Sequence, residues 1–338
     1  MAMFDKLLAN LKASRKKIVF TEGTDARILS AASKLLAEDL MDVILCGNVD
    51  DVKKAAADNG FNIDKAEILD PLTYPEMDSM VSTMVELRKG KMSEEECRTA
   101  LQKSNYFGTM LVKIGKADAL LGGATYSTAD TVRPALQLVK TKKGSNLVSS
   151  SFILFREVNG EEEKIAMGDC AINLGYSDRL DKEGNVVLTA AQQLAEVAVE
   201  TAKTAAYFGI DPKVAVLSFS TYGSGKGGTV QLSHDAVIEA RKIDPELTID
   251  GEFQFDAAVS KEVASVKCPD SKVAGQANTF IFPLIEAGNI GYKIAQRLGG
   301  FAAYGPILQG LNAPINDLSR GCDADEVYKM AIITAGMA

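Results

Sequence analysis

The sequence predicts an α/β protein of two domains with mostly parallel, helix-covered sheets. Short apolar runs alternate with stretches of helical spacing along most of the 338 residues. Two strand-like runs joined by "VNGEEE" (158–163) read as a hairpin that interrupts this alternation, and we interpret it as the entry to a second domain. With 46% hydrophobic and 24% charged residues, the chain has enough apolar material for two cores.

The first elements form a βαβ unit. "KIVF" (17–20) and "DVILCG" (42–47) are predicted strands, and "ARILSAASKLLAE" (26–38) between them has helical spacing. A long helix is expected over residues 190–209, whose final Gly209 suits a helix C-terminus. Because strands and helices alternate, both faces of each sheet should be covered. The other predicted strands are 66–69, 117–123, 148–155, 164–171, 213–220, 247–251, 278–283 and 305–310.

Composition excludes several classes of function. A formal charge of −8 argues against nucleic acid or an anionic membrane as a general partner, since both require a positive surface. The N-terminus lacks the pattern of a signal peptide, and no apolar run approaches the roughly 20 residues that span a bilayer. We therefore expect a cytoplasmic protein.

Cysteine and histidine usage narrows the chemistry. The five cysteines lie far apart without a C-x-x-C pair, and His234 is the single histidine. We expect neither a zinc site nor a disulfide framework. A Ser-His-Asp triad would require His234, for which a place at the start of a helix is the alternative.

The stretch "SFSTYGSGKGGT" (218–229) follows the apolar run "VAVL" and resembles a phosphate loop only in part. In the nucleotide pattern G-x-x-x-x-G-K-[ST], Ser220 stands at the first glycine and Gly227 at the final hydroxyl. Small residues, hydroxyls and Lys226 could still hold a single phosphoryl group. The alternative is a flexible glycine loop between a strand and a helix.

Polar residues just after the apolar runs are candidates for the site, because ligands of open α/β sheets bind at the carboxyl ends of strands. "STADTVRP" (127–134) offers a helix N-terminus together with Arg133, a combination suited to an anion. Alternatively, Thr128 or Asp130 only caps the helix and Arg133 faces solvent. Arg88 lies near a helix end, where the helix dipole alone favours a cation.

The segment "PINDLSRGCDADEVYKMAIITA" (314–335) places Ser319 and Arg320 in a turn just before a helix. Asp323 and Glu326 have the spacing of a capping box, which would tie the Glu326 carboxylate to the helix start. A carboxylate held in this way would be a weak base. Structural capping and catalytic use of Glu326 both remain open, and they do not exclude each other.

Several blocks, in this order, carry a family resemblance: "NYFGTMLV", "STADTVRPALQ", "DCAIN", "SFSTYGSGKG", "DGEFQFDAA", "AGQANTFIFP", "GNIGYKIAQRLG" and "GPILQGLNAPINDLSRGC". They closely resemble the phosphate acetyltransferases, from about Lys17 to the C-terminus. The resemblance implies two α/β domains with the active-site cleft between them. Residues 1–145 plus 307–338 would form the first domain and 146–306 the second. It also implies a homodimer.

The implied reaction is the reversible transfer of an acetyl group between acetyl phosphate and coenzyme A, with inorganic phosphate as the other product. Coenzyme A is a substrate, no cofactor is permanently bound, and no metal takes part in the chemical step. Ser319 and Arg320 match the family's catalytic serine and arginine, with Glu326 in the place of the base. The expected substrate-binding residues are Arg88, Arg133, Ser127, Thr128, Thr221, Ser224, Gly225, Lys226 and Asn316.

Three departures from the family pattern stand out. The family's proposed base is an aspartate seven residues after the serine, where this chain has Glu326. Tyr222 occupies a position that is often lysine, and "LGYSDRLDKEGNVV" (174–187) is a longer connection that we expect to be a surface hairpin or loop. Two alternatives remain, a phosphate butyryltransferase and a non-catalytic sensor of acyl phosphate or coenzyme A.

Overall fold

Short apolar runs form a five-stranded parallel sheet with the strand order β13-β4-β1-β2-β3. The edge strand β13 was not predicted, because it has three residues of which two are polar. It pairs with β4 so that Asp317 lies opposite Gly122 at the carboxyl end. The strands are β1 (Lys17–Phe20), β2 (Asp42–Cys46), β3 (Glu67–Leu69), β4 (Ala119–Gly122) and β13 (Ile315–Asp317).

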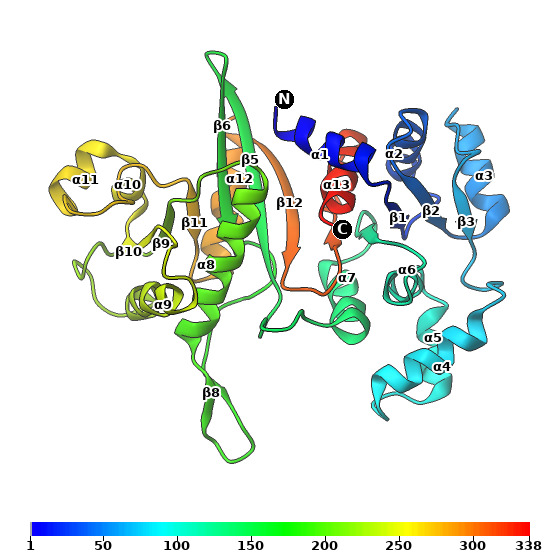
Figure 1. Cartoon of the computed structure of the whole chain (residues 1–338), viewed down its shortest axis with the longest axis horizontal. Coiled ribbons are helices and arrows are strands. Elements are labelled where there is room, and N and C mark those ends of the chain that lie inside the picture. Colours follow the sequence, from blue (N-terminus) through cyan, green and yellow to red (C-terminus); the bar gives the residue numbers. More distant parts are fainter. Residues whose placement is uncertain (1) are drawn as a thin grey trace. The chain divides into compact units, whose positions relative to one another are not determined.

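Helices cover both faces of this sheet (Figure 1). Val19, Ile44 and Leu120 form one core with the helices α4 to α6, whereas α2 and α13 pack on each other, and α13 also contacts β1 and β4. The elements are α1 (Ala2–Ala13), α2 (Ala26–Ala37), α3 (Val49–Asp58), α4 (Met77–Arg88), α5 (Glu94–Leu101), α6 (Ser104–Lys113), α7 (Thr128–Pro134), the π-helical turn η1 (Ala135–Val139) and α13 (Ala324–Gly336).

A second sheet has the order β10-β9-β11-β6-β5-β12. Its first four strands are parallel, while β5 pairs antiparallel with both β6 and β12. The predicted hairpin is confirmed: it joins β5 to β6 through Asn159 and Gly160, both at positive φ. The strands are β5 (Ser149–Val158), β6 (Glu161–Gly168), β9 (Val214–Leu217), β10 (Ile249–Phe253), β11 (Thr279–Ile281) and β12 (Ala302–Gln309).

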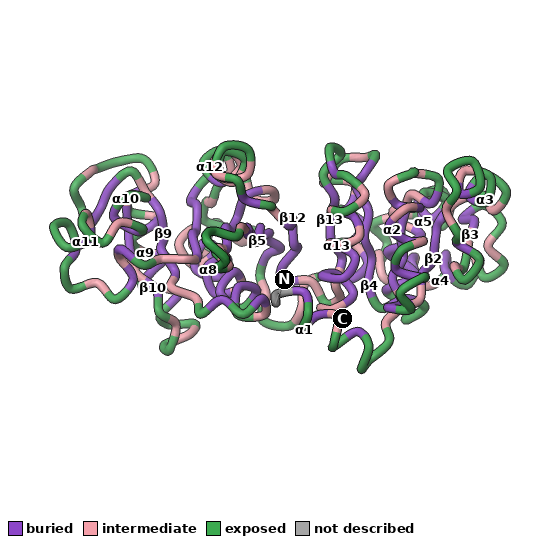
Figure 2. The backbone as a smooth tube through the Cα atoms, turned by 90° about the horizontal axis from the view of Figure 1, so that it is seen from above, coloured by how far each residue is buried: buried purple, intermediate pink, exposed green. Residues whose placement is uncertain are grey.

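Two cores flank the second sheet, one under α8 and α9 and the other under α10 to α12. Figure 2 shows the strands as buried and the outward sides of the helices as exposed. The connection 174–187 forms the expected exposed hairpin, with β7 (Arg179–Leu180) paired to β8 (Val186–Leu188). The helices are α8 (Ala190–Tyr207), α9 (Val230–Ile243), α10 (Phe255–Val259), α11 (Lys261–Lys267) and α12 (Ile285–Arg297).

The computed structural model describes residues 2–338, and its contacts divide the chain into two units. Unit 1 comprises Met1–Lys143 and Leu311–Ala338, and unit 2 comprises Gly144–Gly310. Because β12 pairs with β5, the chain returns to unit 1 at Leu311, later than the expected residue 307. Within the described residues, no helix is both long and apolar enough to cross a bilayer.

Candidate active site

Ser319 and Arg320 lie in a turn just before α13, as the sequence predicted, and both are exposed to solvent. The Oγ of Ser319 accepts a hydrogen bond from the backbone N–H of Gly321 at 3.2 Å. Because this bond uses an acceptor lone pair, the hydroxyl hydrogen of Ser319 remains available for donation. Within residues 2–338, the Arg320 guanidinium makes no hydrogen bond or ion pair, so the turn offers a hydroxyl donor beside an unpaired cation.

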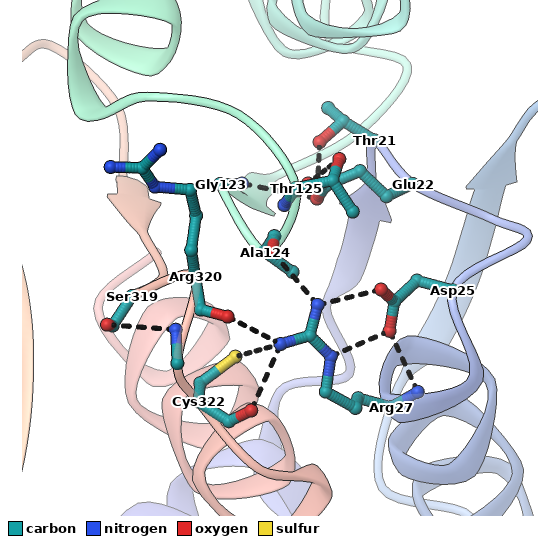
Figure 3. Close-up of polar contacts among 11 residues, drawn as sticks. Thr21, Glu22, Asp25, Arg27, Gly123, Ala124, Thr125, Ser319, Arg320 and Cys322 are labelled. Atoms are coloured by element: carbon teal, nitrogen blue, oxygen red, sulfur yellow. Dashed lines mark hydrogen bonds and ion pairs between the residues drawn. The ribbon is translucent and has the colours of Figure 1, made fainter.

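Arg27, from the first turn of α2, fixes the backbone of this turn (Figure 3). Its Nη1 donates to the carbonyl oxygens of Arg320 and Cys322 at 2.9 and 3.1 Å. Its Nη2 donates to the carbonyl oxygen of Ala124 at 2.9 Å. Nε and Nη2 also bind the two carboxylate oxygens of Asp25 at 3.0 and 2.8 Å. The ion pair with Asp25 raises the pKa of Arg27 further above its usual value, so three loops are held by one permanent cation.

Glu22 organises the neighbouring segment that follows β4. Its carboxylate accepts the backbone N–H of Gly123 at 3.1 Å, and both the N–H and the hydroxyl of Thr125 at 2.7 and 2.9 Å. Burial raises the pKa of Glu22, although these hydrogen bonds act in the opposite direction. Figure 3 shows Glu22 reaching from the end of β1 to this segment, beside the Arg27 cluster.

Asp317 joins the same segment from β13. Its carboxylate accepts the hydroxyls of Thr128 at 2.7 Å and Thr131 at 2.5 Å. Gly123 lies so close that a Cβ there would meet Asp317 Oδ1 at 2.3 Å, and its φ of +103° also favours glycine. The hydroxyl of Thr128 therefore bonds a neighbouring strand instead of capping its own helix, whose N-cap residue is Ser127.

The predicted anion-binding arginines both belong to unit 1. Arg133 lines a pocket of about 450 Å³ together with Lys103 and Tyr106, and it has no ion-pair or hydrogen-bond partner in the described part of the chain. Arg88 ends α4, and its buried Nε has no hydrogen-bond partner among residues 2–338. Nearby Arg133 and Arg88 both favour ionisation of Tyr106, although burial raises the pKa of its hydroxyl overall.

Asn316 lies inside unit 1. Its side chain is fully buried, and Nδ2 donates to the hydroxyl of Thr334 in α13 at 2.9 Å. This bond gives Asn316 a structural role in attaching α13 to the sheet. A role in substrate binding stays a prediction.

Glu326 forms the predicted capping box. Its N–H donates to Asp323 Oδ1 at 2.8 Å, and its Oε2 accepts the N–H of Asp323 at 3.1 Å. The side chain is half-buried, seven residues after Ser319. The carboxylate thus belongs to the start of α13, and catalytic use would have to coexist with this cap.

The glycine-rich loop lies in unit 2, between β9 and α9. Gly225, Lys226 and His234 line a pocket of about 660 Å³ there. Thr221 is buried and its N–H donates to the hydroxyl of Ser224 at 3.0 Å. The exposed Lys226 is the cationic side chain that the loop contributes to this pocket.

A buried carboxylate uses part of the loop's hydrogen-bonding capacity. Glu252 Oε1 accepts the N–H of Gly223 at 2.7 Å and the hydroxyl of Ser220 at 2.8 Å. The N–H of Gly225 donates to Ser220 at 2.9 Å. His234 Nδ1 lies 3.6 Å from Glu252 Oε2, so the single histidine accompanies this buried acid. An anion here would depend mainly on Lys226 and the remaining N–H groups.

Cysteine does not supply a nucleophile near the Ser319 turn. All five cysteines are free and buried. Burial raises the pKa of the Cys322 thiol to about 11, although Arg27 favours the thiolate. A neutral buried thiol is a poor nucleophile, so the exposed functional groups of the turn are the Ser319 hydroxyl and the Arg320 guanidinium.

Comparisons with known proteins identify the class. Residues 2–335 match the family model described as "Phosphate acetyl/butaryl transferase". The phosphate acetyltransferase of Bacillus subtilis (strain 168) is 50% identical over 336 residues, which cover 99% of both chains. A phosphotransacetylase structure from Streptococcus pyogenes has 49% identity and a TM-score of 0.90, covering 99% of this chain and 97% of that one. The EutD phosphotransacetylase of Staphylococcus aureus has 47% identity and a TM-score of 0.84, covering 98% of both.

The chain therefore belongs to the phosphate acetyl/butyryl transferase family, a family of acyltransferases. The comparisons confirm the predicted α/β class and the predicted enzyme class. With about half of its residues shared with phosphate acetyltransferases over nearly the full length, its activity is that of a phosphate acetyltransferase. The butyryl and sensor alternatives are not favoured.

Sequence reasoning missed Arg27 and Asp317 as parts of this site. Both bond partners more than 180 residues away in the chain, and no local motif records such pairings. Glu22 lies just after the predicted strand 17–20. Its position at a strand end was the available signal, because that edge of a parallel sheet is where ligands bind.

Proposed function

We propose that the chain catalyses direct attack of the coenzyme A thiolate on the carbonyl carbon of acetyl phosphate. A bond forms between the sulfur and the carbonyl carbon. The bond between that carbon and the bridging oxygen of the phosphate breaks, and inorganic phosphate leaves. The reverse reaction follows the same path. The Ser319 hydroxyl donates a hydrogen bond to the oxyanion that develops on the carbonyl. Its support is the Gly321 N–H bond, which orients the hydroxyl oxygen and leaves its hydrogen to donate.

Arg320 neutralises the phosphoryl group or the developing oxyanion. Its guanidinium is exposed and unpaired within residues 2–338, and its backbone carbonyl is held by Arg27. Arginine suits this role because its planar fork of N–H donors matches phosphate oxygens. The charge is thus presented from an anchored backbone.

Arg88 and Arg133 bind phosphate groups of the substrates, with Ser127 and Thr128 at the start of α7 beside them. The 450 Å³ pocket at Arg133 and the buried unpartnered Nε of Arg88 support this assignment. Which phosphate each arginine meets, on acetyl phosphate or on coenzyme A, is set by the ligand pose.

Glu326 is the candidate base for the thiol proton. Its carboxylate lies at the start of α13, seven residues after Ser319, and its Oε2 accepts the Asp323 N–H. Capping also fixes the direction of the carboxylate relative to the Ser319 turn.

In unit 2, Thr221, Ser224, Gly225 and Lys226 bind the phosphoryl group of acetyl phosphate. The 660 Å³ pocket beside Lys226 supports this role, and a single phosphoryl group does not need a complete nucleotide motif. A site in a cleft between the two domains, with contributions from both, stays a prediction. The same holds for the contribution of Asn316.

Coenzyme A is a substrate, and we propose that the chemical step needs neither a permanently bound cofactor nor a metal. Among the described residues, no cluster of three or more His, Cys, Asp or Glu side chains is arranged to hold a metal ion. In the proposed mechanism, a hydroxyl donor and arginines stabilise the charge that a metal would otherwise neutralise.

A homodimer paired through unit 2 is the proposed assembly. Of 18 exposed large hydrophobic side chains among the described residues, 16 belong to unit 2. Several of them, including Phe219, Phe255 and Ile294, line an apolar groove of about 940 Å³. Such a surface suits burial against a second copy.

A cytoplasmic location is also proposed. Its support is that all five cysteines are unpaired, as is usual in a reducing compartment.

Thioester absorbance with acetyl phosphate and coenzyme A, in a chelator and without added metal, tests this function. We expect rapid formation of acetyl-coenzyme A and slower turnover of butyryl phosphate. Saturable binding of either substrate without thioester formation would overturn it in favour of a sensor. Turnover only on restoring a divalent metal would contradict the metal-free step.

A further inference from the structure

Asp317 connects two parts of the site that are far apart in the sequence. It is the last residue of β13, its side chain is 1% exposed, and both of its bonding hydroxyls come from α7. Thr128 is the first residue of that helix, and Thr131 lies almost one turn later. The carboxylate therefore ties the start of α7 to the end of β13.

Both connected segments carry proposed functional residues. Ser319 and Arg320 follow Asp317 by two and three residues, and Arg133 lies on α7 two residues after Thr131. Just beyond the strand, the N–H of Leu318 donates to the carbonyl oxygen of Gly122 at 2.7 Å. A change at the Asp317 link would thus move the Ser319 turn relative to Arg133.

The surroundings of Asp317 are acidic. Glu22 from the turn after β1 and Asp130 on α7 both disfavour its ionised form, and the Tyr126 hydroxyl from the intervening segment adds no positive charge. Burial is the largest cause that raises the pKa of Asp317, to about 6, against the two threonine hydrogen bonds. Within residues 2–338, no cation forms an ion pair or a hydrogen bond with it.

An amide would make a less expensive structural link at this position. Burying a carboxylate without a cation is unfavourable, whereas an asparagine of the same shape could still accept one hydroxyl. The presence of an acid that accepts two hydroxyls therefore points to a requirement that an amide would not meet.

We propose that ionised Asp317 is a positioning residue for acyl transfer, holding the Ser319–Arg320 turn in register with the end of α7 that carries Arg133. This inference rests on the proposed roles of Ser319, Arg320 and Arg133. Asp317 acts through these residues and does not itself touch the substrate.

Protonation of Asp317 breaks this arrangement. A neutral carboxyl group has one O–H that must donate, so it no longer presents two fully acceptor oxygens to Thr128 and Thr131. The kcat should therefore fall as the pH decreases through about 6, with a smaller change in KM.

The first test measures kcat and KM between pH 5 and 8.5 for the wild type and two variants. The acid limb is the fall of kcat as the pH decreases through about 6. We expect Asp317→Asn to lower kcat at least about tenfold at pH 7.5 and to lose this acid limb. Thr131→Val should move the limb to higher pH, because it removes a hydrogen bond that lowers the pKa of Asp317. A wild-type kcat and an unmoved limb in both variants would overturn the proposal.

Asp70→Asn is the matched control. Asp70 is also buried, accepts the Leu72 N–H at 2.9 Å, and follows β3 at the opposite edge of the same sheet. It should keep the wild-type pH profile. Loss of the limb in this control would assign the effect to buried carboxylates in general and contradict a specific role for Asp317.

Thermal stability separates positioning from simple structure. Because the folded pKa of Asp317 is raised, the native state binds more protons than the unfolded state between about pH 4 and 6, so stability falls as the pH rises through that window. Asp317→Asn removes this penalty and should have an equal or higher Tm at pH 8 despite its lower kcat. Asp317 would be purely structural if the Tm of Asp317→Asn falls enough to account for its lost activity and the acid limb of Thr131→Val does not move. Full activity of Ser319→Ala in the same series would instead refute the proposed role of Ser319, on which this inference rests.

Discussion

Arg27 holds the backbone carbonyl of Arg320 at 2.9 Å across 293 residues of sequence. One cation near the N-terminus thereby fixes the main chain of the turn that carries Ser319 and Arg320. The Arg320 side chain points away from this cluster in Figure 3, so anchoring its backbone leaves the guanidinium available for a ligand. Within the turn, the Gly321 N–H donates to Ser319 Oγ at 3.2 Å and the Cys322 N–H donates to the Ser319 carbonyl oxygen at 2.9 Å, and the Arg27 link adds an anchor to α2.

Replacing Arg27 with lysine should preserve the charge and lose the link. A single ammonium group cannot bind Asp25 bidentately and also reach the carbonyls of Ala124 and Arg320. We expect kcat to fall about tenfold or more, and stability to fall by about 2 kcal/mol from the lost charge-assisted bonds. Steady-state kinetics and denaturant unfolding measure the two effects. As a control, Arg98→Lys at an exposed ion pair on α5 should change neither kcat nor stability appreciably. An unchanged kcat in Arg27→Lys would show that Arg27 does not position the turn.

Local sequence signals predicted the elements that depend on local physics. Alternating apolar runs located most strands, and the spacing of Asp323 and Glu326 predicted the capping box that the structure contains. The turn at Ser319 was also predicted, since the polar "NDLSRG" run directly precedes a helical pattern. These features are determined by residues a few positions apart.

Features that depend on distant pairing were not predictable. β13 has only three residues and exists because β4 offers it a parallel edge. Asp317 lies in a mostly polar stretch of sequence, yet it is buried because Thr128 and Thr131 satisfy its carboxylate. The contact of Asn316 with Thr334 in α13 is another such distant pairing, and the expected role of Asn316 in substrate binding stays a prediction.

Glu326→Gln separates the capping role from the catalytic one. The glutamine amide oxygen can still accept the Asp323 N–H, so the capping box and the Tm should be preserved. Loss of the base should lower kcat by about 100-fold, at the lower end of general-base contributions. Kinetics and thermal melting of the same preparation provide both readouts. An unchanged kcat would leave Glu326 as a helix cap alone.

Lys226→Ala tests the phosphoryl-binding loop. Removing the exposed cation of that pocket should raise the KM for acetyl phosphate by several-fold, about 1 kcal/mol, and change the KM for coenzyme A less. Lys203→Ala on α8, where the lysine pairs with Glu200 at 2.9 Å, serves as a surface control. Equal effects of Lys226→Ala on both KM values would place the loop outside the phosphoryl site.

The most direct test of the mechanism is the kcat of Ser319→Ala with acetyl phosphate and coenzyme A. A donor aimed at the oxyanion contributes about 3 kcal/mol to the transition state, so kcat should fall about 100-fold while the Tm changes little for this exposed residue. Ser82→Ala, at another exposed serine hydroxyl on α4, should retain full activity. A Ser319→Ala enzyme with the wild-type kcat would contradict oxyanion stabilisation by this turn.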